Sequence, residues 1–345
     1  MFRQEDSFHW DWRDKTIDSM QRRRFDQAIA QLPPLGVSSL DQLSSRALSS
    51  KLERCWQDIP CKPMRLLQEE EIWAQVLRTI DHQADCLSHH EHELIEKALI
   101  LGGTAQIEDA VELEAAQALS LRLWCHVGIV SDKPHVKIER PIMRAIAKAF
   151  ARPEHERIRL RFGVFHEHLS GVLYQVGALD DRQPQMMIRR DILSSVSDDE
   201  QALQLARRYL WASYDCIDYS GGVLLIHDAL ADPRKMIPDI RRKTEFSFLD
   251  GRAGLAALDI LPEEIPIQFE LEHVIQPALR NGLQSQDVAR NLRFLCKQGA
   301  PLSALEEVLQ SALIVYLTPA MKSALNKMYR MIPKWIECSE AAMLQ

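Results

Sequence analysis

The sequence predicts a mainly α-helical protein in which a helix, a small β-hairpin and a second helix recur as a module, followed by a C-terminal bundle of helical hairpins. Three observations support this fold class. Apolar residues recur every three or four positions over most of the chain. Short alternating stretches around polar turns interrupt that helical period. The C-terminal third carries closely spaced signals for helix starts.

Residues 1–65 are expected to form one helix and a connector. The segment from Arg13 to Gln31 has a helical pattern, and the two prolines of "LPPLG" forbid its continuation. A serine-rich stretch, "GVSSLDQLSSRALSS", follows. Trp10 and Trp12 precede the helix. Because buried tryptophans dominate interface energetics, we interpret these two as candidate anchors for a partner or as a flap that packs on the body.

Residues 66–245 contain the repeated modules. Helical patterns cover 67–85, 92–101 and 107–126, and the stretch "VGIVSDKPHVKIE" then alternates around a Ser-Asp-Lys-Pro turn. We therefore expect a hairpin over 128–139. In "RPIMRAIAKAF" the helical period returns, with Pro141 at the first turn and an apolar stripe on one face.

A second stretch, "VGALDDRQPQMMIRRDIL" at 176–193, echoes the first. The alignment pairs Gly128 with Gly177 and Asp132 with Asp181, so a second hairpin is expected over 177–189. A weaker third copy follows the helical pattern of "SDDEQALQLARRYLWASY", where Gly221 and Gly222 provide a turn before an alternating run.

Residues 246–345 are expected to form the C-terminal helical domain. Ser285 and Ser303 are predicted to cap two helices, the second in a capping box with Glu306. Thr318 followed by Pro319 predicts the start of a third helix.

A helix followed by a two-stranded wing resembles the winged-helix fold, and the resemblance covers Ile107 to Asp232. It implies DNA binding or docking in a multiprotein complex. In a groove-reading winged helix, the helix before the wing faces phosphates and base edges. Here the first such helix carries one base, Arg122, against four acids: Glu108, Asp109, Glu112 and Glu114. This charge does not suit groove reading.

Charge is segregated along a chain whose net charge is −7. Residues 66–118 contain twelve acidic and two basic residues. Residues 133–161 contain nine basic and three acidic residues. Net negative charge argues against non-specific coating of DNA. The two blocks either meet each other or meet separate partners.

The basic block supplies the candidate partner-binding residues, for either protein or nucleic acid: Lys137, Arg140, Arg144, Lys148 and Arg152. Three of them recur every fourth residue on the side of a helix opposite its apolar stripe. This ridge is either an ordinary solvated face, a set of pairs with nearby acids, or a contact for phosphates or an acidic partner.

One stretch, "DHQADCLSHHEHEL", is a candidate metal site. If one helix persists through it, His82, Cys86, His89 and Glu93 align along one face with side chains suited to zinc. An inter-helix turn at 88–90 is the alternative. The chain has no H-E-x-x-H, phosphate-loop or G-x-G-x-x-G motif, and its seven scattered cysteines lack a C-x-x-C pair. No cofactor is expected.

Taken together, these features predict a non-enzymatic adaptor or regulatory subunit that binds protein partners within a larger cytoplasmic assembly. No signal sequence or membrane span is expected. The first alternative is a nucleic-acid-associated protein that uses residues 133–161. The second is a metal-dependent enzyme centred on residues 82–93.

Overall fold

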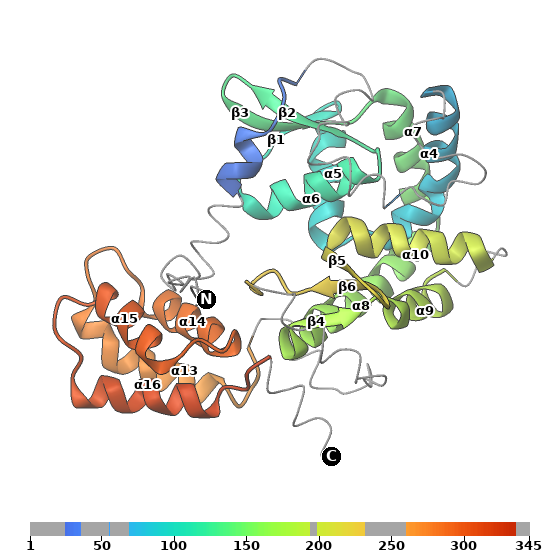
Figure 1. The fold of residues 1–345 in the computed structure, drawn as a ribbon. Helices are drawn as coiled ribbons and strands as arrows, with labels where there is room; N and C mark the ends of the chain where they lie inside the picture. Colours follow the sequence, from blue (N-terminus) through green and yellow to red (C-terminus); the bar gives the residue numbers. More distant parts are fainter. Residues whose placement is uncertain (1–24, 36–54, 56–68, 194–198, 232–259, 336–345) are drawn as a thin grey trace, which may run out of the picture.

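The computed structural model describes residues 25–35, 55, 69–193, 199–231 and 260–335. The protein is mainly helical and contains two small three-stranded antiparallel sheets. The predicted mainly α-helical class is therefore confirmed. Figure 1 shows one sheet unit at the top, a second unit beneath it and the C-terminal helices to one side.

The first unit surrounds one sheet with helices. Its elements are, in order, α4 (Glu69–Gln83), η3 (Ala84–Cys86), α5 (His89–Ile100), β1 (Thr104–Gln106), α6 (Ala110–Leu121), β2 (His126–Val130), β3 (Lys133–Lys137) and α7 (Arg140–Phe150). Strands β2 and β3 form the hairpin expected within 128–139, and β1 pairs with the other edge of β3. Ser131 and Asp132 both have positive φ, which is the backbone of a two-residue hairpin turn.

The hairpin predicted over 177–189 is wrong. Helix α8 (His155–Val176) ends at Gly177, a three-residue strand β4 (Ala178–Asp180) follows, and α9 (Arg182–Asp191) begins at once. Pro184 falls within the first turn of α9, where a residue without an N–H is tolerated. Ile188 is buried on the same helix. The segment therefore satisfies a helical rather than an alternating pattern.

The hairpin of the second unit lies instead at residues 215–226, the segment that the sequence analysis gives as the third and weakest copy. Helix α10 (Asp199–Ser213) leads into β5 (Asp215–Tyr219) and β6 (Gly222–Ile226), which pair with each other around a Ser220-Gly221 turn. Strand β4 pairs with β6. The strand orders β1-β3-β2 and β4-β6-β5 are therefore the same, although the sequence echo at 176–193 aligned different elements.

The C-terminal helices are α13 (Ile265–Ile275), η6 (Gln276–Ala278), α14 (Ser285–Lys297), α15 (Leu302–Ala312) and α16 (Pro319–Met331), and they enclose their own apolar core. Thr318 caps α16 as expected, by accepting a hydrogen bond from the Met321 amide. The other two caps are wrong: Ser285 lies inside α14, and Pro301 occupies the cap position of α15, so the capping box of Ser303 is not formed.

The part of the N-terminal region that is described lies against the first sheet. Residues 25–30 are helical, and the helix ends before Pro33, as the two prolines predict. The Leu35 amide donates to the Ile129 carbonyl at 2.9 Å, and the Ile129 amide donates to the Pro33 carbonyl at 2.8 Å. The chain thus adds a short parallel pairing to the free edge of β2. Trp10, Trp12 and the expected domain boundaries after residues 65 and 245 lie outside the described residues.

A buried polar and aromatic cluster joins the second unit to the C-terminal helices. Tyr174 on α8 donates to the carboxylate of Glu264, and Lys297 Nζ lies 2.9 Å from the same carboxylate. Trp335 donates from Nε1 to the Tyr174 carbonyl at 2.8 Å and packs against Gly177. Because all three side chains of the polar group are almost fully buried, their pairing is required to offset the cost of removing charge from water.

Candidate interaction surface

The predicted basic ridge exists as a surface of α7. The helix starts at Arg140 with Pro141 in its first turn, and Ile142, Ile146 and Ala149 are buried against the first unit. Arg140, Arg144 and Lys148 are exposed on the other side. The i, i+3, i+4 spacing of the apolar residues fixes which face packs, so the three bases are left together facing solvent.

The three ridge side chains have no ion-pair partner among the described residues. Lys137 differs from them, because its Nζ lies 3.0 Å from Glu139 Oε1 at the start of α7. We therefore restrict the name "cationic ridge" to Arg140, Arg144 and Lys148.

Arg152, the fifth predicted surface base, has an internal role. Its guanidinium donates to Asp85 Oδ1 at 2.5 Å and to the Asp81 carbonyl at 2.6 Å. Asp85 is buried and also lies 3.0 Å from His155 Nδ1. The acidic and basic blocks of the sequence thus meet at this point within the molecule, and the contact ties the end of α7 to α4 and η3.

Three stacked rings hold the same end of α7. Phe150 stacks on His92 of α5 and on His155 of α8, with centroid separations of 4.5 and 4.8 Å, and the centroids of the two histidine rings are 6.0 Å apart. Burial lowers the pKa of His92, although the neighbouring Glu96 opposes this effect. The ring contacts with α5 and α8, together with the Arg152 bond to Asp85, hold the end of α7 against its neighbours.

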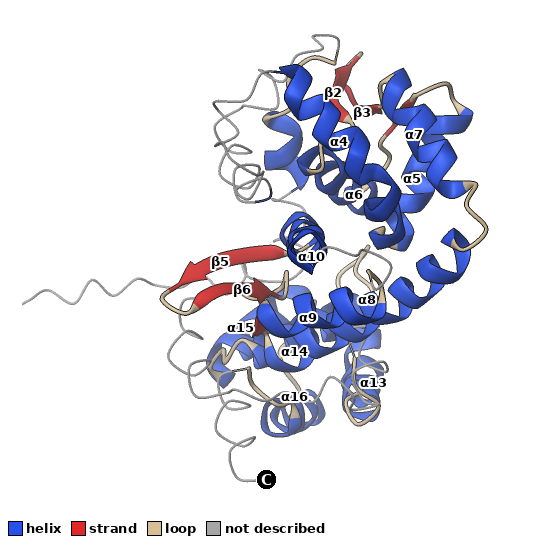
Figure 2. Ribbon diagram, turned by 90° about the vertical axis from the view of Figure 1, so that its right-hand side faces the viewer, coloured by secondary structure: helices blue, strands red, loops and turns tan. Residues whose placement is uncertain are grey.

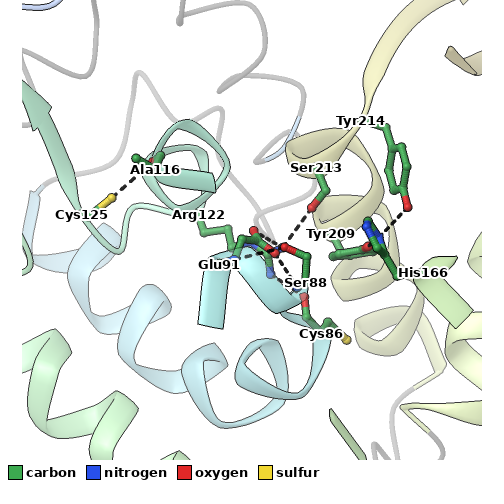
Figure 3. A network of polar contacts seen from close by, with 10 residues as sticks. All are labelled: Cys86, Ser88, Glu91, Ala116, Arg122, Cys125, His166, Tyr209, Ser213 and Tyr214. Carbon is green, nitrogen blue, oxygen red and sulfur yellow. Dashed lines mark hydrogen bonds and ion pairs between the residues drawn. The ribbon is translucent and has the colours of Figure 1, made fainter. Parts of the chain in front are cut away.

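The helices that precede the two hairpins, α6 and α10, pack against each other. Arg122, directly after α6, lies at the centre of the contact (Figure 3). It donates to Glu91 Oε1 at 2.9 Å, to the Cys86 carbonyl at 3.1 Å and to Ser213 Oγ of α10 at 3.2 Å. The side chains of Arg122 and Glu91 are 2% and 1% exposed. This buried ion pair lies within the first unit, and the bond from Arg122 to Ser213 is the contact that reaches the second unit.

A second part of the same network lies between α8 and α10. His166 Nδ1 lies 2.6 Å from the hydroxyl oxygen of Tyr209 and at the same distance from that of Tyr214, as Figure 3 shows. Burial lowers the pKa of His166 to about 4, so the ring is neutral near pH 7. Arg122 lies 5.4 Å from the centroid of the Tyr209 ring, which connects the two parts.

The geometry assumed for the candidate metal site is wrong. Helix α4 ends at Gln83, and Ser88 caps α5 in a capping box with Glu91, so His82, Cys86, His89 and Glu93 do not share one helix. Cys86 is buried, and burial raises the pKa of its thiol. His89 and Glu93 instead form an exposed pair at 3.2 Å. Over the described residues, no group of three or more His, Cys, Asp or Glu side chains is arranged to hold a metal ion.

Sequence reasoning missed the residues that join the units. Arg122 was noted in the sequence only as the single base against four acids, and its partner Glu91 lies 31 residues earlier in the chain, so the sequence does not reveal the contact. Within the described ranges, no helix is both long and apolar enough to cross a membrane.

No protein-family model, curated protein or solved structure matches this chain.

Proposed function

We propose that the protein is a non-enzymatic adaptor that binds an acidic protein partner through the cationic ridge of α7. The observation that carries this proposal is the packing of α6 against α10 around Arg122. It supports a tandem scaffold, because α6 and α10 pack together and Arg122 contacts both Ser213 and the Tyr209 ring of α10. The ridge, in contrast, has no partner among the described residues.

The two sheet units are, in this proposal, winged-helix-like modules. The order α8, β4, α9, α10, β5 and β6 places one helix directly before the hairpin, and α6 holds the corresponding place in the first unit. A winged-helix protein that reads the major groove needs this helix at its surface. Here seven of the twelve residues of α6 are buried. The scaffold is therefore better suited to docking than to reading base edges.

Residues 66–245 would then form the scaffold, with residues 1–65 and 246–345 as flanking domains. The separate apolar core of the C-terminal helices supports the second of these divisions. The nucleic-acid alternative keeps one supporting observation, the three unpaired bases of the ridge, since duplex phosphates also attract cations.

The experiment is affinity capture from the native host with the full chain, with and without nuclease. A variant with Arg140, Arg144 and Lys148 all changed to Glu should lose a partner that the wild type retains after nuclease treatment. A control carries the same change at two exposed bases on α16, Lys322 and Arg330, and should retain it; Lys327 is left unchanged because it pairs with Glu270. Capture that vanishes with nuclease, or that the ridge variant preserves, would contradict the proposal.

A further inference from the structure

The outer edge of the first sheet is closed by a short segment from the N-terminal region. In the sheet order β1-β3-β2, strand β2 has a neighbouring strand on one side only. On its other side, residues 33–35 pair in parallel with Ile129 through two hydrogen bonds, and we refer to these residues as the strap. Figure 1 shows the segment in blue beside the sheet, and Figure 2 shows β2 and β3 at the top of the molecule, away from β5 and β6.

The strap uses only part of this edge. The amide and carbonyl of Ile129 point away from β3 and bind the strap, and backbone direction alternates along a strand, so the amide and carbonyl of Val127 point to the same edge. Neither group of Val127 makes a backbone hydrogen bond outside the sheet with the described residues. The strap residue that would continue the pairing is Pro33, which has no N–H to donate to the Val127 carbonyl. The pairing therefore stops after one residue of β2.

The strap is held by few contacts, although it lies very close to β2. None of residues 25–35 is buried, and such lightly packed segments open at low cost in free energy. A Cβ on Gly128 would lie 2.7 Å from the Pro33 carbonyl oxygen and 2.8 Å from the Leu35 nitrogen. Glycine within a strand often marks a site where another backbone approaches closely. Gly128 thus makes room at this edge for an extended chain.

We propose that the β2 edge is a strand-acceptor site for an extended segment of a protein partner, and that the strap closes this site until the segment displaces it. The edge presents backbone donors and acceptors at sheet spacing, which an extended peptide strand matches. The strap pairs with Ile129 alone, whereas a partner strand with an N–H in place of Pro33 pairs with both Ile129 and Val127. The additional hydrogen bonds favour the partner over the strap. The site lies on β2 and does not depend on the cationic ridge of α7.

The test uses the full chain and a peptide of known sequence. The probe is a fluorescein-labelled copy of residues 25–36 with Pro33→Val, which supplies the missing N–H, and fluorescence anisotropy measures its binding. The same peptide with the native proline should bind about fivefold more weakly, because it lacks the bond to the Val127 carbonyl. Leu35→Pro in the chain removes the strap's donor to Ile129, so the probe no longer competes with the strap and should bind about fivefold more tightly or better.

Further measurements establish that the probe binds at this edge. The bound probe should slow hydrogen exchange of the Val127 amide, because the carbonyl of its Gln31 then accepts from that amide. Gly128→Ala, added to Leu35→Pro in the chain, should weaken binding, because the new Cβ meets any backbone in the strap's place.

Two controls complete the test. A probe that also carries Leu35→Pro should not bind, because it lacks the donor to Ile129. The variant with glutamate at the three positions of the cationic ridge should bind the probe normally, so the two proposals fail independently. Equal binding of the two peptides, equal binding by the wild type and Leu35→Pro, unchanged exchange at Val127, or no binding to Leu35→Pro at about 100 µM would each overturn the inference.

Discussion

Replacing Arg122 should destabilise the protein more than replacing any exposed arginine, because it unpairs a buried charge. Arg122→Met removes the 2.9 Å contact with Glu91 and the bonds to the Cys86 carbonyl and Ser213. Glu91 remains almost fully buried, with a remaining bond from the Ser88 amide at 2.7 Å. Breaking a buried ion pair in this way costs about 3 to 5 kcal/mol of unfolding free energy.

A double-mutant cycle isolates the pair. Glu91→Gln leaves Arg122 buried without its counter-charge, so it should also be strongly destabilising. The double variant removes both charges, and its cost should fall short of the sum of the single costs by about 2 to 3 kcal/mol. As a control, Arg182→Met breaks an ion pair with Asp180 in which the arginine is 72% exposed, and it should cost less than about 1 kcal/mol.

The assay is urea denaturation followed by tryptophan fluorescence, which reports on the buried Trp124 and Trp211. A destabilisation below about 1 kcal/mol for Arg122→Met, or single costs that simply add in the double variant, would refute the reasoning that Arg122 and Glu91 stabilise the fold as a coupled buried pair.

Three further predictions concern the contacts that fix the fold. Gly177→Ala should lower the free energy of unfolding by about 2 kcal/mol or more, because residue 177 has a φ of +76° and the new Cβ would lie 2.8 Å from the ring of the buried Trp335. An unchanged denaturation midpoint would contradict this prediction. As pH falls from about 6.5 to about 4, His166 takes up a proton in the unfolded state but stays neutral in the folded state, so the free energy of unfolding should fall by up to about 1.4 kcal/mol per pH unit and level off below pH 4. His166→Asn should lack this pH-dependent loss in urea titrations at several pH values. An identical pH profile for the variant and the wild type would contradict the prediction. Gly128→Ala should accelerate hydrogen exchange of the Ile129 amide, because a Cβ would lie 2.7 Å from the Pro33 carbonyl oxygen; equal exchange rates would contradict the edge pairing.

Local patterns predicted local structure well. The hairpin of β2 and β3 was visible because turn residues and alternation lie within twelve residues of each other. The buried and exposed faces of α7 were visible because the helical period places Ile142, Ile146 and Ala149 on one side. In both cases the deciding contacts are close in the sequence.

Non-local contacts account for the wrong predictions. Strand β4 pairs with β6, as in Ala178 with Ile226, so its partner could not be found from the segment 177–189 itself. Arg152 was predicted to be a surface base, but its partner Asp85 is 67 residues away in the sequence. The interrupted helix at the expected metal site was more accessible, because Ser88 and Glu91 have the spacing of a capping box.

The most direct test of the central claim, that this scaffold binds protein rather than reading nucleic acid, is an anisotropy titration against duplex and single-stranded probes at several salt concentrations. We expect no duplex binding at about 150 mM salt, because α6 and α10 are buried against each other and the whole chain is acidic. Sub-micromolar, salt-sensitive binding by the wild type that disappears when Arg140, Arg144 and Lys148 are changed to Glu would contradict the account. In that case the slope of log affinity against log salt should fall by about 0.9 for each phosphate that the variant no longer neutralises.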